Sequence, residues 1–172
     1  MATSYPDSQH SDPLQVGAEF LDFVTVTLHA RGLYLQPFTS KKYQYNKGES
    51  LQGWEVKLDQ RLSDTHRLSI EIAEKTRSAN AIWVPSGIYR NDNTWLYIQG
   101  NYDAFYIFLK RFLIQLHQCK RYTEHEIPTV RKFYLPVADA DRYGERIARP
   151  IAQQDYLATG LMRLVGAREM AT

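Results

Sequence analysis

The sequence predicts a mixed α/β fold, and three observations lead to this prediction. Residues 13–31 repeat apolar side chains at helical spacing. Residues 54–59 and 67–75 alternate apolar with polar side chains, as half-buried strands do, and residues 102–117 form an apolar stretch of helical length. A chain of 172 residues can bury one sizeable core, so we expect these elements to pack into one α/β domain.

Composition and charge exclude several classes of protein. Hydrophobic residues make up 44% of the chain and charged residues 23%, which excludes a largely disordered protein. The net charge of +2 is too small to indicate a nucleic-acid partner by itself, so such a partner must meet a local basic patch. Cys119 is the single cysteine, which excludes an internal disulfide and a cysteine zinc cluster.

The N-terminal segment and the hydropathy of the chain predict where the protein is found. Residues 1–12 are polar and contain no basic segment followed by an apolar run, so we expect a disordered N-terminal segment. No stretch approaches the roughly 20 apolar residues of a membrane span. We therefore expect residues 13–172 to form the domain, the protein to be cytoplasmic, and no membrane association.

The first helix has recognisable start and stop signals. Asp12 is a suitable N-cap, Pro13 suits the first helical position, and Gly32 ends the pattern. The apolar positions of the helix are Leu14, Leu21, Val24 and Leu28.

The other elements are predicted from local pattern and turn residues. We expect a short edge strand at 32–38, an exposed loop at 40–53, further strands within 81–89, 94–100 and 129–136, a helix at 102–117, and helical stretches over 139–166 broken near Pro150.

The strands at 54–59 and 67–75 are predicted to pair as an antiparallel hairpin, because residues 63–66 have the composition of a turn. Alternation places Glu55, Lys57 and Asp59 on one face of the first strand. With the turn centred near residue 65, the opposed pairs are Asp59 with Glu71, Lys57 with Ala73, and Glu55 with Lys75.

Opposed carboxylates on Asp59 and Glu71 would repel unless a cation or a shared proton intervened. Mg²⁺ takes oxygen ligands and keeps several waters, so one or two carboxylates and a substrate phosphate suit it. Lys57 would lie beside this pair and stabilise developing negative charge. The same charges also suit a solvated face of a hairpin, with Glu55 and Lys75 as a weak ion pair.

These residues resemble the PD-(D/E)XK, or restriction-endonuclease-like, superfamily, whose core is a helix, three mostly antiparallel strands, a helix and a strand. Asp59 matches the acid of the second strand and Glu71 the acid of the third, whereas Ala73 stands where the lysine belongs. The resemblance implies that Lys57, or less directly Lys75, replaces that lysine. It implies a central mixed sheet with a hairpin core flanked by helices.

The resemblance also implies a function. Many members add a glutamate from the first helix, and Glu19 matches it; an exposed surface glutamate is the other interpretation. The expected activity is that of a nuclease or DNA-processing protein that depends on Mg²⁺, with Mn²⁺ as a substitute, and a homo-oligomer is compatible with it. The alternative is a catalytically inactive member that binds DNA or a protein.

Several residues outside the hairpin have more than one interpretation. Basic residues after position 109 suit phosphate contacts or an ordinary solvated face. Trp83 and Trp95 suit either stacking on unpaired bases or packing in the core. His117, Cys119 and His125 lack a fourth ligand and do not predict a metal site.

Overall fold

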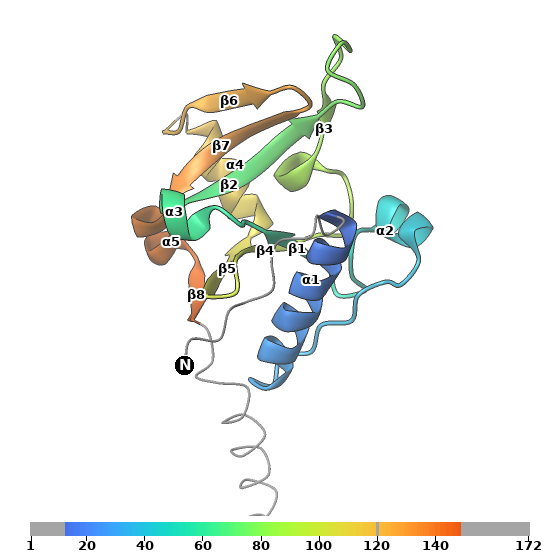
Figure 1. Ribbon diagram of the computed structural model, residues 1–172, viewed down its shortest axis with the longest axis vertical. Helices are drawn as coiled ribbons and strands as arrows, with labels where there is room; N and C mark the ends of the chain where they lie inside the picture. Colours follow the sequence, from blue (N-terminus) through green and yellow to red (C-terminus); the bar gives the residue numbers. More distant parts are fainter. Residues whose placement is uncertain (1–12, 120, 149–172) are drawn as a thin grey trace, which may run out of the picture.

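The structure is a computed structural model that describes residues 13–119 and 121–148 (Figure 1). Its helices are α1 (Pro13–His29), α2 (Lys41–Lys47), α3 (Leu62–Thr65), α4 (Lys110–Gln118) and α5 (Val137–Tyr143), and a 3-10 turn, η1, covers Gly87–Tyr89. Its strands are β1 (Trp54–Leu58), β2 (Arg67–Glu74), β3 (Val84–Pro85), β4 (Leu96–Gly100), β5 (Ala104–Leu109), β6 (Glu124–Ile127), β7 (Val130–Pro136) and β8 (Glu145–Ala148). The predicted α/β class is confirmed.

The described strands form two four-stranded sheets. The first sheet has the order β1-β4-β5-β8, with β1 parallel to β4 and the other pairs antiparallel. The second sheet has the order β3-β2-β7-β6 and is antiparallel throughout. Figure 1 shows the second sheet at the top, α1 below, and the first sheet between them.

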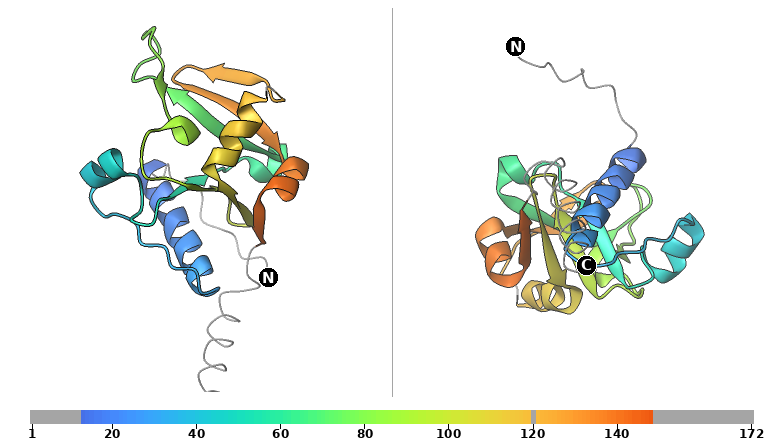
Figure 2. Two further views of the ribbon diagram at one scale, coloured as in Figure 1. Left: turned by 180° about the vertical axis from the view of Figure 1, so that it is seen from behind. Right: turned by 90° about the horizontal axis from the view of Figure 1, so that it is seen from below.

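Two hydrophobic clusters hold these layers together. The first cluster fills the space between the sheets, where Ile70 of β2 and Phe133 of β7 pack with Tyr97 of β4, and α4 contributes Leu113. In the left view of Figure 2, which is turned by 180° from Figure 1, α4 lies in front of the sheets. The second cluster lies on the other face of the first sheet, against Phe20, Val24 and Leu28 of α1. The first sheet is therefore buried on both faces.

The predicted hairpin is wrong. Instead, β1 pairs in parallel with β4, and β2 pairs with β3 and β7 in the other sheet. In a hairpin, the apolar faces of β1 and β2 would lie on the same side of one sheet and would be covered by one cluster. Here Trp54 of β1 packs in the cluster under α1, whereas Ile70 of β2 packs in the cluster between the sheets. The connection includes a helix, α3, whose Leu62 is buried, and it leads the chain from one sheet to the other.

The predicted helix at 102–117 is a strand followed by a helix, β5 and α4. In β5, Phe105 and Ile107 face α1 while Tyr106 and Phe108 face the second sheet, so both faces of the strand are apolar. A continuous apolar run of this kind fits a strand buried on both faces as well as a helix.

Other boundaries differ less. The first helix ends at His29, and Gly32 with φ of 78° follows it, as expected. The expected loop at 40–53 contains α2, and the expected edge strand is reduced to one isolated bridge between Pro37 and Ser50. Of the predicted C-terminal helices, α5 is present and β8 follows it. Residues 1–12 and 149–172 lie outside the described residues.

Membrane association was not expected. Among the described residues, no helix combines the length and the apolar character that crossing a bilayer requires.

Candidate functional site

Asp59 lies at the junction of the two sheets, directly after β1. Its Oδ2 accepts hydrogen bonds from the backbone N–H of Ser69 at 2.8 Å and from Gln99 Nε2 at 3.2 Å, and its Oδ1 accepts from the N–H of Arg61 at 3.3 Å. Because Ser69 belongs to β2 and Gln99 to β4, the carboxylate ties the edge of the second sheet to the face of the first. The side chain is buried, and three protein donors already occupy its oxygens.

Glu71 does not face Asp59 across a hairpin, so the predicted register of this pair is wrong. Its backbone partner is Lys132 of β7, and its carboxylate accepts a hydrogen bond from the Ser86 hydroxyl. Gly87 adjoins this position, since a Cβ there would clash with the Glu71 carbonyl oxygen. The turn η1 therefore packs directly on β2 at Glu71.

Ala73 and Lys75 also have partners other than those predicted. A bulge separates Glu71 from Ala73, and Ala73 pairs with Arg131 of β7 and with Pro85 of β3. The Lys75 ammonium lies 4.7 Å from the centroid of the Trp83 ring. Lys57 is therefore not opposite Ala73, and Glu55 is not opposite Lys75.

Lys57 lies between two carboxylates. Its Nζ is 3.0 Å from Glu49 Oε1 and 3.0 Å from Glu55 Oε1. The predicted alternation of β1 places Glu55 and Lys57 on the face that points away from α1, next to Tyr97 and Gln99 of β4. Glu49 approaches from the segment before β1, and its second oxygen accepts a hydrogen bond from the N–H of Val56.

Burial sets the electrostatics of this group. Only 1% of the Glu55 side chain is exposed, compared with 34% of Lys57 and 24% of Glu49. Burial raises the pKa of the Glu55 carboxyl above its ordinary value, because the opposing effect of the Lys57 charge is smaller and Glu49 adds to the rise. Burial lowers the pKa of Lys57, but the charges of Glu55 and Glu49 outweigh it and the pKa is raised.

The raised pKa of Glu55 predicts a pH dependence of stability. The folded protein binds this proton more tightly than the unfolded chain, so Glu55 lowers the free energy of unfolding at neutral pH. This cost shrinks as the pH falls from the folded pKa to the ordinary value of 4.5, and it vanishes below that value, where both states are protonated. Glu55→Gln removes the titration, so the variant should gain most over the parent at neutral pH and least near pH 4.5. Urea unfolding of both proteins at several pH values measures this gain, and a gain that does not vary with pH would contradict it.

Tyr97 lies within electrostatic range of both predicted acids. The hydroxyl of Tyr97 is fully buried, and burial raises its pKa well above the ordinary value. Four negative charges raise it further, those of Glu55, Glu71, Glu49 and Asp59. We call these four residues the carboxylate cluster. Asp59 and Glu71 thus both act electrostatically on Tyr97, although they are not a cross-strand pair.

Glu19 lies elsewhere. It is exposed on α1, where its Oε1 accepts a hydrogen bond from Gln15 Nε2 at 3.1 Å. Burial raises the pKa of Tyr102, and the charge of Glu19 adds to that rise. Tyr102 is in the turn between β4 and β5, away from the hydroxyl of Tyr97.

Two buried oxygen atoms on the first sheet have no hydrogen-bond partner among the described residues: Glu55 Oε2 and Gln99 Oε1. The amide orientation of Gln99 is set by its nitrogen, which donates to Asp59 Oδ2 and to the carbonyl of Ser69. Glu55 and Gln99 are diagonal neighbours on β1 and β4. Oxygen ligands of this kind are the ones that hard cations such as Mg²⁺ bind. The described residues contain no group of three or more His, Cys, Asp or Glu side chains able to hold a metal.

Comparisons with protein-family models, with curated proteins and with solved structures find no match to this chain. The site must therefore be interpreted from its own chemistry.

Sequence patterns indicated only part of this site. Alternation on β1 identified Glu55 and Lys57, but Glu49 precedes the strand in a segment without periodicity. Tyr97 and Gln99 lie on β4, whose position beside β1 is not encoded in either segment alone. The one local signal on β4 was the amide of Gln99 within an otherwise apolar strand.

Proposed function

We propose that this protein is a Mg²⁺-dependent phosphodiesterase of the PD-(D/E)XK nuclease-like type that acts on DNA, with its site at Glu55, Lys57 and the rest of the carboxylate cluster. Relative to the sequence-based hypothesis, the centre of the site moves from Asp59 to Glu55. Asp59 supports the site by holding the sheets together.

One observation carries the proposal. Glu55 is almost fully buried, one of its oxygens has no hydrogen-bond partner among the described residues, and its other oxygen is 3.0 Å from Lys57. Leaving a carboxylate oxygen buried without a partner costs stability. Perturbed acids of this kind cluster at functional sites. The partly exposed Lys57 and Glu49 leave the group accessible from outside.

The residues divide the work of phosphodiester hydrolysis between them. Glu55 and Gln99 supply free oxygen ligands, and Glu71 adds a further negative charge that attracts a divalent ion. When bound, Mg²⁺ supplies charge that polarises the phosphate and acidifies a water. Lys57 stabilises the negative charge that builds up on the phosphate as the attacking water oxygen forms its bond to phosphorus and the bond to the leaving sugar oxygen breaks. The water loses a proton to solvent, and the leaving sugar oxygen takes one up from solvent.

A cleavage assay tests the proposal. End-labelled single-stranded, double-stranded and branched DNA are incubated with the protein and Mg²⁺ or Mn²⁺, and with EDTA as the metal-free control. We expect cleavage that needs the metal and that falls by about 100-fold or more in Glu55→Gln. Glu74→Gln, which changes an exposed glutamate at the end of β2, is the matched control and should cleave as the parent does. Binding of Mn²⁺, followed by its paramagnetic resonance, should weaken in Glu55→Gln alone.

The alternative function is a nuclease-like module that binds DNA or a protein without cleaving. Two observations favour it: three protein donors occupy Asp59, and Ala73 stands at the usual lysine position. Folded parent protein that cuts none of the three substrates with either metal would establish this alternative over the nuclease.

A further inference from the structure

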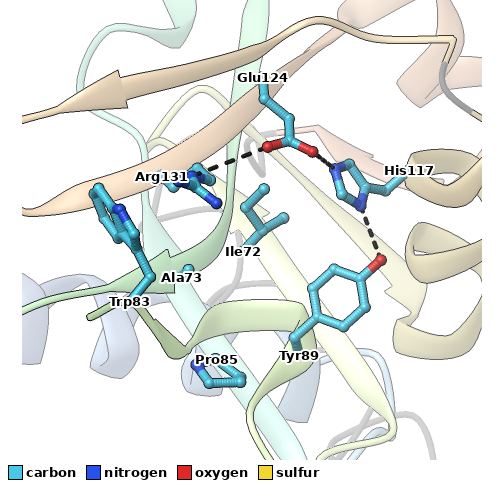
Figure 3. Close-up of a pocket in the computed structure, with 8 residues that line it drawn as sticks. All are labelled: Ile72, Ala73, Trp83, Pro85, Tyr89, His117, Glu124 and Arg131. Carbon is cyan, nitrogen blue, oxygen red and sulfur yellow. Dashed lines mark hydrogen bonds and ion pairs between the residues drawn. The ribbon is translucent and has the colours of Figure 1, made fainter. Parts of the chain in front are cut away.

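A separate pocket of about 390 Å³ opens beside the second sheet (Figure 3). Its walls come from β2, from β3 and the segment before it, and from η1, α4, β6 and β7. The lining residues are Ile72, Ala73, Trp83, Pro85, Tyr89, His117, Glu124 and Arg131. None of these residues belongs to the carboxylate cluster.

Trp83 forms an aromatic wall of the pocket. It is partly exposed and belongs to neither hydrophobic cluster, so of its two interpretations, packing in the core is wrong. The Lys75 ammonium and the Arg131 guanidinium each lie 4.7 Å from its ring centroid. Cations at this distance are attracted to the ring and hold it in place. The wall therefore combines an aromatic ring with two positive charges that lie over it, and a flat ligand that stacks on the ring takes the place of one of these side chains.

A chain of hydrogen bonds forms the opposite wall. Tyr89 Oη is 2.8 Å from His117 Nδ1, and His117 Nε2 is 3.1 Å from Glu124 Oε1. The other Glu124 oxygen is 4.0 Å from Arg131 Nε, and that buried nitrogen has no hydrogen-bond partner among the described residues. Figure 3 shows His117 between Tyr89 and Glu124. This wall contains a carboxylate bonded to His117 and a buried arginine nitrogen without a hydrogen-bond partner among the described residues.

Apolar side chains complete the pocket, with Ile72 and Ala73 from β2 and Pro85 from β3. A ligand that matches these walls is flat, carries hydrogen-bonding groups on its edge, and is attached to a negative charge. An unpaired nucleobase with its phosphate has all three properties, and bases stack on aromatic side chains in proteins that bind single strands. A base inside a duplex cannot expose its face in this way.

We propose that this pocket binds an unpaired nucleobase. The base stacks on Trp83, its amino group donates to Glu124, and its phosphate lies near Lys75 and Arg131. A carboxylate accepts from the N4 amino group of cytosine, whereas thymine presents a carbonyl oxygen at the corresponding position. The pocket should therefore prefer cytosine to thymine.

The pocket adjoins the candidate site along the chain. Ile72 follows Glu71 directly, and Pro85 precedes Ser86, whose hydroxyl donates to the Glu71 carboxylate. The pocket and Glu71 therefore share β2 and the segment that joins β3 to η1. Binding itself requires no metal and no cleavage, so this inference stands or fails apart from the proposed function.

Fluorescence anisotropy in EDTA tests the inference without cleavage. Labelled oligo-dC should bind more tightly than oligo-dT, and a duplex of equal length should bind least. Trp83→Ala should weaken oligo-dC binding roughly five- to 150-fold, which is the range measured for loss of one stacked base. Trp83→Phe keeps an aromatic face and should keep most of the affinity. Trp95→Ala is the matched control, because Trp95 is also exposed, at 53%, but lies outside the pocket.

Glu124→Gln and a competition experiment complete the test. The amide offers a donor as well as an acceptor, so the variant should lose the preference of oligo-dC over oligo-dT. Competition by free CMP would identify a single nucleotide as sufficient, and its failure alongside a Trp83 effect would identify a strand as the ligand; both results support the pocket. Equal oligo-dC affinity in folded Trp83→Ala and parent, or duplex binding as tight as single-strand binding, would overturn the inference.

Discussion

Asp59→Ala is expected to lower the free energy of unfolding by about 3 kcal/mol. The substitution removes the acceptor of the Ser69 N–H and one acceptor of the Gln99 amide, both at the junction between the two sheets. A buried donor left without a partner costs about 1 to 3 kcal/mol, and bonds to a charged acceptor are the stronger ones. Urea unfolding in EDTA, followed by circular dichroism, measures the loss.

Two variants serve as controls for this prediction. Asp59→Asn keeps one carbonyl oxygen as an acceptor and should cost less than Asp59→Ala. Asp64→Ala changes an exposed aspartate on α3 and should stay within about 0.5 kcal/mol of the parent. If Asp59 serves instead as a metal ligand without a structural role, Asp59→Ala in EDTA would be as stable as the parent or more stable.

Lys57→Ala is expected to lower the cleavage rate by a factor of about 10² to 10⁴, the range for removing a group that acts in the transition state. The lysine is 3.0 Å from both Glu49 and Glu55, so its removal also leaves the buried Glu55 charge uncompensated. Glu55 then binds a proton more readily and holds a cation less well. Single-turnover cleavage at saturating Mg²⁺ measures the rate.

Lys75→Ala separates the two lysines that the sequence offered. The Lys75 ammonium lies over Trp83, away from Lys57 and its two carboxylates, so this variant should retain the single-turnover rate when the protein is in saturating excess over DNA, although its DNA binding should weaken. Lys57→Arg keeps the positive charge and should retain more activity than Lys57→Ala. A larger rate loss in Lys75→Ala than in Lys57→Ala would show that the site is not centred on Glu55.

Local patterns predicted the faces of strands but not their partners. Alternation in β1 correctly placed Glu55 and Lys57 on one face of the strand and Trp54 on the other. The side-chain period of a strand is a property of its own residues. The partner of β1 is β4, and Trp54 pairs with Leu96. Whether β1 pairs with a strand near in sequence or with a distant one depends on which apolar faces the rest of the fold covers. Neither strand carries that information alone.

The same limit explains the incomplete prediction of the site. Asp59, Glu71 and Lys57 were selected by a register that does not exist, and the acids gather through the packing of one sheet on the other. Gln99 and Glu49 lie beside Glu55 and Lys57 because β4 and the segment before β1 pack against β1. The sequence does not reveal either of these contacts. Trp83 was recognised as a candidate for stacking because aromatic residues near basic ones suit that role, while its exposure required the fold.

The separation of β1 and β2 into different sheets has a consequence for synthesis of the chain. The carboxylate cluster needs β1 beside β4 and β2 beside β7, and Arg67 of β2 pairs with Pro136. Pairings between distant segments form late, because loop closure must precede them. A chain emerging from the ribosome therefore carries all four acids long before it can bring them together, and on our proposal it remains harmless to DNA until β7 has been made.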